Sequence, residues 1–140
     1  MIEGMFSGGA LPVLERMVQF TEARHTVLTH NIANVSTPYF KPSDLDPARF
    51  QTSLREAIKD RRSNGGPLQF RDTRQIRFRD HSIETHPDFR NENILFHDRN
   101  SRDLERMMQD LVENTMTHNM AVEMLRHEFE MIRTAIRGRI

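Results

Sequence analysis

Two acid and histidine pairs at helical spacing are the residues best suited to metal chemistry. Glu22 and His25 stand at i, i+3, the spacing found in di-iron helical bundles, and Glu123 and His127 stand at i, i+4. A carboxylate-bridged site needs a second Glu-x-x-His pair and further inward glutamates, which the sequence does not supply. His127 and Glu128 also lack the second histidine of a zinc protease motif. We therefore expect no metal, no cofactor and no catalytic residues, and a di-iron helical-bundle enzyme stands only as an alternative.

Four arginines alternate with two phenylalanines in the Phe70–Arg79 segment, a combination that could hold phosphates and stack bases. Asp72 and Asp80 lie in the same stretch, and the chain carries 20 basic and 20 acidic residues. Specific nucleic-acid binders usually present a net basic face, whereas arginine forks also pair with carboxylates. We predict carboxylate partners on a neighbouring subunit, and a nucleic-acid-binding helical protein that uses the Arg71–Arg79 segment is the alternative. The arginines are Arg71, Arg74, Arg77 and Arg79.

The composition indicates a small protein with a limited hydrophobic core. Of 140 residues, 36% are hydrophobic and 29% charged, and the mean hydropathy is -0.67. These values are low for a compact fold yet too apolar for full disorder. The chain has no cysteine, which excludes disulfides and thiolate zinc sites. No stretch approaches the roughly 20 apolar residues of a membrane span, and we expect no cleaved signal peptide.

An apolar stripe with alternating steps of three and four residues predicts a long N-terminal helix from Leu11 to Ile32. A second stripe beside it indicates that the helix is buried on more than one side. Asn34 is expected to end the helix in a left-handed conformation, and Pro38 steers Thr37 out of the helix. The first stripe contains Leu11, Leu14, Val18, Leu28 and Ile32, and the second contains Val13, Met17, Phe20 and Val27.

A longer stripe predicts a C-terminal helix from Asn100 to Gly138, about 55 Å long. A heptad pattern sustained over this length is typical of a coiled coil or an array. Several methionines on the helix favour a contact face that tolerates different neighbours, although each one alone also fits plain core packing. The stripe is Leu104, Met108, Leu111, Thr115, His118, Val122, Leu125, Phe129, Ile132 and Ile136, and the methionines are Met107, Met108, Met116, Met120, Met124 and Met131.

Polar residues interrupt both stripes near the middle of each helix. Thr21 and His25 take two places in the N-terminal stripe, and Thr115 and His118 take two in the C-terminal one. A shared polar layer would fix the register between the helices at some cost in stability. The same residues would also be accommodated by solvent or a loop, and the sequence leaves both interpretations open.

The middle of the chain loses the long helical period. Asp46 and Pro47 resemble a cap followed by a first-turn proline, and they predict a short amphipathic helix to about Arg62. The run Ser63–Pro67 then breaks the chain. After it, only residues 75–79 alternate well enough to predict one short strand or hairpin arm.

These patterns predict an all-α protein whose two long terminal helices pack as a coiled-coil-like hairpin, with a short helix and a weakly ordered polar middle segment that orders on assembly. The chain divides into residues 1–40 (N-terminal helix and exit), 41–100 (short helix and middle) and 101–140 (C-terminal helix). The residues predicted to form the assembly seam are Leu14, Val18, Leu28, Ile32, Leu111, Val122, Leu125, Phe129 and Ile132.

Both ends of the chain carry motifs of one family. The segment Leu28–Lys41, which reads LTHNIANVSTPYFK, resembles the N-I-A-N-x-x-T-P-G-Y-K signature of flagellar axial proteins. Residues 98–105, DRNSRDLE, are similar to the D-G-N-N-V-D-L-E opening of the C-terminal helix in flagellar basal-body rod proteins of the proximal B type. Tyr39 stands where the family has glycine, and Arg99, Ser101 and Arg102 replace glycine, asparagine and valine.

The resemblance implies a structural subunit of the bacterial flagellar basal-body rod, in the periplasm, exported by the flagellar type III apparatus. The terminal axial helices would stack with other rod proteins and with copies of the chain into a tube that transmits torque and surrounds the export channel. The rod base and export gate would be further partners, without nucleic acid and without direct membrane insertion. Asn31, Asn34, Thr37 and Pro38 would shape the exit from the first helix.

Overall fold

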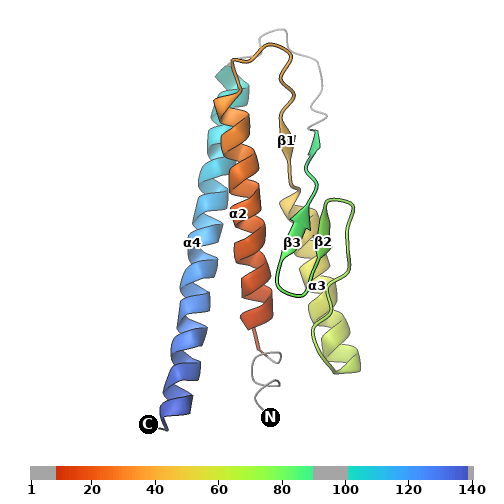
Figure 1. The fold of residues 1–140 in the computed structure, drawn as a ribbon, viewed down its shortest axis with the longest axis vertical. Coiled ribbons are helices and arrows are strands. Elements are labelled where there is room, and N and C mark those ends of the chain that lie inside the picture. Colours follow the sequence, from red (N-terminus) through yellow and green to blue (C-terminus); the bar gives the residue numbers. More distant parts are fainter. Residues whose placement is uncertain (1–8, 90–100, 139–140) are drawn as a thin grey trace.

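Two long helices lie side by side along the long axis of the molecule, and the longer one continues past the other at one end (Figure 1). The computed structural model describes residues 9–89 and 101–138. Helix α2 (Leu11–Ala33) and helix α4 (Ser101–Arg137) run antiparallel, so α2 begins and α4 ends at the same end of the molecule. The bounds agree with the predicted terminal helices to within a residue, and the pairing of the two helices is as predicted.

The short helix of the middle segment is α3 (Pro47–Asn64). Its start is capped as the sequence indicates, because the Asp46 carboxylate accepts hydrogen bonds from the backbone N–H groups of Ala48 (2.9 Å) and Arg49 (3.3 Å). Gly65 follows the helix with φ +69, a backbone conformation that glycine adopts without steric cost. The predicted short helix is therefore confirmed.

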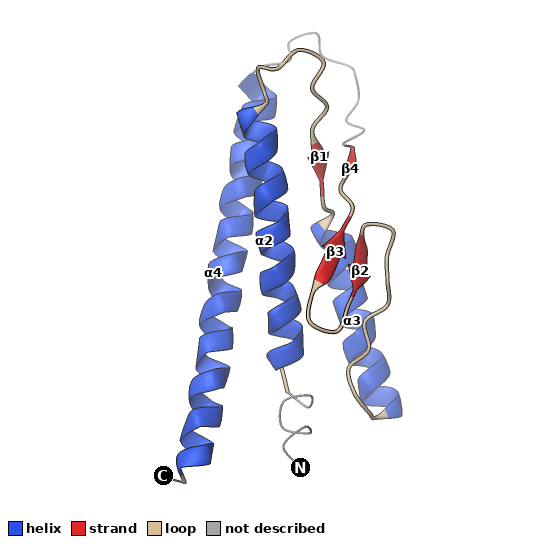
Figure 2. Ribbon diagram, in the orientation of Figure 1, coloured by secondary structure: helices blue, strands red, loops and turns tan. Residues whose placement is uncertain are grey.

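The prediction of an all-α fold needs correction, because two small antiparallel sheets lie in the middle segment (Figure 2). β2 (Ile76–Phe78) pairs with β3 (Ile83–Thr85), and β1 (Ser43–Asp44) pairs with β4 (Asp88–Phe89). β2 is the strand predicted at residues 75–79. The other strands have two or three residues each, too few for an alternating pattern to show in the sequence.

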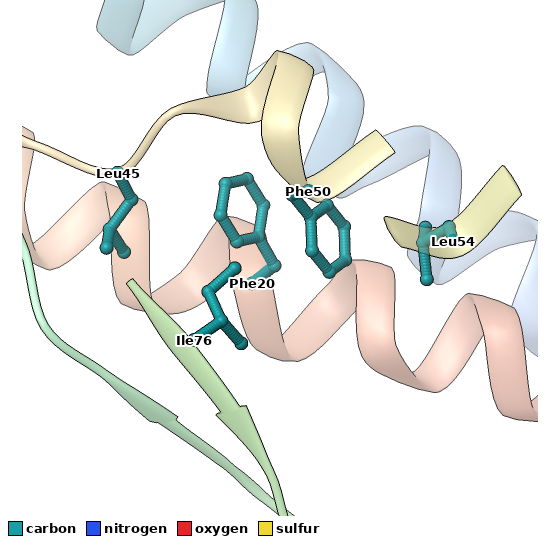
Figure 3. Packing of buried hydrophobic residues seen from close by; sticks show 5 residues of the cluster. All are labelled: Phe20, Leu45, Phe50, Leu54 and Ile76. Carbon is teal, nitrogen blue, oxygen red and sulfur yellow. The ribbon is translucent and has the colours of Figure 1, made fainter. Parts of the chain in front are cut away.

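The hydrophobic core lies between α2 and the middle segment (Figure 3). The rings of Phe20 and Phe50 stack with their centroids 4.0 Å apart, and α3 supplies Phe50. The second stripe of α2 packs here as partly buried residues, which confirms that α2 is buried on two sides: one faces α4 and the other faces this core. The remaining core residues are Leu45, Leu54 and Ile76.

Replacing Phe20 by alanine is expected to destabilise the protein by about 3–5 kcal/mol, because it removes a ring that is 3% exposed and leaves a cavity against Phe50. Urea unfolding followed by circular dichroism measures the loss. Met116→Ala, at a position 67% exposed on α4, is the control and should change the free energy of unfolding by less than about 0.5 kcal/mol. Equal losses for both variants would contradict the placement of the core.

Candidate assembly surface

A buried polar layer joins α2 to α4 near the middle of α2. The Thr21 hydroxyl lies 2.8 Å from Nδ1 of His118, and the Asn114 amide donates a hydrogen bond of 2.8 Å to the backbone carbonyl of Thr21. Of the two interpretations, a polar layer shared between the helices therefore holds for Thr21 and His118. His25 is instead exposed, and the Thr115 hydroxyl donates to a carbonyl of its own helix. Because a shift of one helical turn would break both contacts, the layer fixes the register of the two helices.

The face of α4 that packs on α2 is rotated slightly about the helix axis relative to the predicted apolar stripe. The most buried residues of α4 are Met107, Asn114 and Ala121, which repeat every seven residues, whereas Met108 and Phe129 of the predicted stripe are about half exposed. Asn114 and Ala121 are not large apolar residues, so a search for apolar periodicity does not find them. A small residue such as Ala121, 0% exposed, lets two helices approach closely.

The residues predicted to form the assembly seam are therefore divided between interior and surface. Leu14 and Leu28 are buried in the described structure, and Phe129 is 49% exposed. The others are half-buried along the pair of helices, and the role of the whole set in assembly stays a prediction. These half-buried residues are Val18, Ile32, Leu111, Val122, Leu125 and Ile132.

Helix α4 also exposes large apolar side chains over most of its length. Monomeric soluble proteins expose isolated apolar residues routinely, but a series of them along one helix marks an interaction surface. Most are methionines, whose flexible side chains adapt to irregular neighbours. We call this set the outer surface of α4: Met108, Val112, Met116, Met120, Met124, Phe129, Met131 and Ile136.

Asn31 fastens the end of α2 to the start of the middle segment. Its amide nitrogen donates to the Ser43 carbonyl (2.6 Å), and its amide oxygen accepts from the Ser43 N–H (3.2 Å). The side chain is completely buried. Asn31 therefore forms with Ser43 of β1 the two hydrogen bonds that a neighbouring strand would form. These bonds also hold together the two ends of the loop between α2 and β1. The predicted role of Asn31 in shaping the exit from the first helix stays a prediction, to which these two bonds to Ser43 give a physical basis.

The turn that leaves α2 differs from the prediction at one position. Asn34 ends the helix with φ −105, so it does not adopt the expected left-handed conformation. Its amide donates to the His30 carbonyl (2.9 Å), and its own carbonyl accepts from the Thr37 N–H (2.9 Å). Pro38 is exposed, and the left-handed residue is Tyr39, with φ +62. The glycine of the flagellar axial signature would stand at this same position, which explains its use there.

Two buried arginines of α2 hold the middle segment in place. Arg24 forms a bidentate ion pair with Asp44, with both nitrogen–oxygen distances 3.0 Å. Arg16 donates to the carbonyls of Arg79 (2.6 Å), Asp80 (2.8 Å) and Ser82 (3.0 Å) in the turn between β2 and β3. Sequence analysis missed both, because an arginine within an amphipathic helix is usually solvated.

Three of the four arginines of this segment pair with carboxylates of the same chain, which corrects for these three the prediction of partners on a neighbouring subunit. Arg71 pairs with Asp60 (2.9 Å), Arg74 with Asp88 (3.6 Å) and Arg79 with Glu84 (3.0 Å). The hydrogen bond from Arg79 holds the pKa of Glu84 below its ordinary value.

The two phenylalanines of this segment are also engaged within the chain. The rings of Phe70 and Phe78 stack on each other with centroids 5.1 Å apart, and both rings pack against the core. Neither Phe70 nor Phe78 is therefore freely exposed for stacking on a base, as nucleic-acid binding through this segment would require.

The histidine and acid pairs lie on the helix surface. Glu22 and His25 are exposed on α2, and Glu123 pairs with Arg126 at 3.0 Å on α4. Within residues 9–89 and 101–138, no group of three or more histidine, aspartate or glutamate side chains is arranged to hold a metal ion. Across the same ranges, none of the helices has the length and apolar character needed to span a membrane.

These features describe an elongated helical protein with a small side unit and an exposed apolar surface along its longest helix. The chain is similar to the flagellar basal body rod protein FlgB of Borrelia hermsii, with 25% identity over 134 residues. The alignment covers 91% of this chain and 96% of the relative. This likeness confirms the resemblance to flagellar rod proteins that the two terminal motifs indicate. No protein-family model and no solved structure matches the chain.

Asn31→Ala is expected to lower the free energy of unfolding by about 2–4 kcal/mol, because the Ser43 N–H and carbonyl would both lose a buried partner. Thermal or urea denaturation measures the change. The matched control is Asn34→Ala, where water can replace the lost bond and the cost should stay below about 1 kcal/mol. If the two variants were equally stable, the two hydrogen bonds between Asn31 and Ser43 would not contribute to stability as described.

Tyr39→Gly is expected to stabilise the isolated protein by about 1 kcal/mol, because glycine, which has no Cβ, adopts a positive φ without the steric cost that an L-residue incurs. The Tyr39 side chain is 99% exposed, so no packing is lost. A rise in the midpoint of urea unfolding at unchanged slope would show this. Tyr39→Ala, which keeps the strain, should leave the midpoint nearly unchanged, and a loss of stability in the glycine variant would contradict the assignment.

Proposed function

We propose that this protein is a structural subunit of the bacterial flagellar basal-body rod, in its proximal part. The observation that carries the proposal is the similarity to a rod protein along nearly the full length of both chains. A match of that extent includes both terminal helices and the segment between them. It therefore favours the same overall role, which is mechanical and not catalytic.

The outer surface of α4 supports this role physically. Its exposed methionines, Val112, Phe129 and Ile136 would lose contact with water where another chain covers them, and burying apolar area stabilises a contact by about 25 cal/mol per Å². Helices of neighbouring subunits packed on this surface would form a wall of parallel helices. Such a wall is stiff along its axis and would transmit torque while it encloses a central export channel.

In this proposal the predicted seam has two functions. Residues already buried between α2 and α4, such as Leu14 and Leu28, hold the helices of one subunit together. Phe129 and the half-buried edges of the pair, including Val122, extend that packing to neighbours. Asn31, Asn34, Thr37 and Pro38 set the direction in which the chain leaves α2, and so the position of the side unit relative to the wall.

The partners in this proposal are other rod proteins, copies of this chain, and components of the rod base and export gate. The site of action is the periplasmic rod, reached through the flagellar type III apparatus. The equal numbers of acidic and basic residues leave little charge repulsion to oppose close packing of subunits.

The direct test is a deletion strain of the source organism, complemented with the natural chain. Basal bodies from the complemented strain should contain the chain by mass spectrometry, and the deletion strain should form no rod and be non-motile. Rods of normal appearance in the deletion strain, together with basal bodies that lack the chain in the complemented one, would exclude the proposal.

Met116→Asp should abolish rod assembly and motility in the complementation assay while the isolated variant stays folded. The side chain is 67% exposed, so a carboxylate is solvated in the free chain but would be buried without a partner in the wall. Helical circular dichroism checks the fold, and rod counts check assembly. Gln51→Asp adds the same charge at an exposed position of α3 and should assemble normally. Normal rods from the Met116 variant would show that the outer surface of α4 is not an interface.

A further inference from the structure

Helix α4 carries most of the sulfur atoms of this chain. The chain contains no cysteine, so methionine is its only sulfur-containing residue. Six of the nine methionines lie on α4, and five of these six are between 44% and 67% exposed. The sixth, Met107, lies on the face that packs on α2 and is 4% exposed. The exposed five are Met108, Met116, Met120, Met124 and Met131.

Three of the exposed methionines form one continuous row. Met116, Met120 and Met124 stand four residues apart, so each side chain lies beside the next on the helix surface. From residue 114 to residue 122 the sequence contains no aspartate, glutamate, lysine or arginine. Depletion of charge is typical of the centre of an interface. Thioethers therefore supply the apolar character in the middle of the outer surface of α4.

An accessible thioether reacts with peroxides to give a sulfoxide. A lone pair of the sulfur attacks one oxygen of hydrogen peroxide, and the S–O bond forms as the O–O bond breaks. The proton of the attacked oxygen passes to the other oxygen, which leaves as water. The sulfur loses two electrons and the peroxide gains them. A flexible apolar side chain thus becomes a polar one.

We propose that the five exposed methionines of α4 are oxidation sites for peroxide, and that a free chain oxidised there is not added to the assembly. The effect on assembly rests on the proposed function, whereas the selectivity of the oxidation does not. A sulfoxide oxygen is solvated in the free chain, but it loses water without gaining a fixed hydrogen-bond donor when a neighbour covers the surface. Methionine sulfoxide reductases restore the thioether, so the block is reversible.

Burial protects the same sulfur chemistry, and one pair of residues shows how. Met107 and Met108 are adjacent in the sequence, yet α2 covers the first, while the second is 52% exposed. A neighbouring subunit packed on the outer surface of α4 would cover its thioethers in the same way. Oxidation would therefore act on chains that are not yet assembled and leave finished assemblies unchanged.

Peptide mapping of the purified chain tests the selectivity. The chain is treated with limiting hydrogen peroxide, and mass spectrometry with fragmentation measures the oxidation rate at each methionine. In the folded chain, Met108, Met116 and Met120 should oxidise at least about tenfold faster than Met107, which reacts only when α4 separates locally from α2. In concentrated urea the rates should become similar. Equal rates in the folded chain would overturn the proposal.

The fold of the oxidised chain is the second part of this test. The reactive side chains lie on the outside of α4, so helical circular dichroism should be the same before and after treatment. A loss of helix on oxidation at the exposed positions would overturn the proposal, because unfolding and not an altered surface would then block assembly.

Complementation under peroxide tests the effect on assembly. A variant with leucine at all five exposed positions keeps the apolar surface but cannot be oxidised there. Sublethal hydrogen peroxide should lower the number of new rods several-fold in the strain with the natural chain and have little effect with the leucine variant. Damage to other components is common to all strains. Met107→Leu, the matched control, removes a thioether that peroxide does not reach and should respond like the natural chain.

Two results of this experiment would overturn the proposal. One is an equal loss of rods in the natural and leucine strains under peroxide. The other is a leucine variant that forms no rods even without peroxide, because the thioethers would then be required for packing and not as oxidation sites.

Glutamine imitates the sulfoxide without any oxidant, because it places a neutral polar group on a side chain of similar length. A double variant, Met116→Gln with Met120→Gln, should fold normally and form several-fold fewer rods, since both positions are exposed in the free chain. Met116→Leu with Met120→Leu is the control and should form normal rods. Normal rods from the glutamine variant would refute the effect on assembly.

The failure of this inference can be distinguished from the failure of the proposed function. Normal rods in the deletion strain would refute the rod assignment, and the oxidation rates of Met107 and Met108 would still decide the selectivity. A deletion strain without rods, together with equal peroxide sensitivity of the natural and leucine strains, would leave the rod assignment standing and refute the inference.

Discussion

The structure depends on α2 being packed on two sides at once. One side carries Thr21, which meets Asn114 and His118 of α4, and the other carries Phe20, which stacks on Phe50 of α3. A helix covered on opposite sides has little free surface left for charged side chains. The two arginines that remain inside, Arg16 and Arg24, are therefore fully engaged with carbonyls of the β2–β3 turn and with Asp44. Removing either partner would leave an unpaired buried charge.

This arrangement gives the two long helices different roles. Helix α2 is the interior element that fixes both α4 and the middle segment, whereas α4 packs mainly on α2 and exposes apolar side chains on its other sides. Polar contacts set the registers, and apolar contacts supply most of the stability, because hydrogen bonds demand a specific geometry while apolar packing tolerates small shifts. In the proposed rod, the packed side of α2 would preserve the shape of each subunit and the exposed apolar side chains of α4 would contact its neighbours.

Helical periodicity in the sequence predicted the three helices but not the strands or the contacts between elements. The bounds of α2 and α4, the Asp46 cap and the stacking stripe around Phe20 all follow from local patterns. Alternation predicted β2, but the other strands, of two or three residues, leave no such pattern. β3 pairs with β2 across a short turn, whereas β1 and β4 are distant in the sequence and pair only in the folded chain. Apolar periodicity also did not predict the face of α4 that packs on α2. Asn114 contributes a hydrogen bond there and Ala121 allows close approach of the helices, and neither is a large apolar residue.

The sequence by itself determined the two terminal helices, the short capped helix and, through the motifs at both ends, the resemblance to flagellar rod proteins. Only the tertiary structure decided which side of α4 faces α2, that Arg24 meets Asp44, that Asn31 clamps Ser43, and that Tyr39 rather than Asn34 adopts the left-handed conformation. The physical reason is the separation along the sequence between the residues that interact. Helix formation and capping depend on residues within four positions of each other, whereas these contacts join positions 12 to 97 residues apart or depend on how a turn closes.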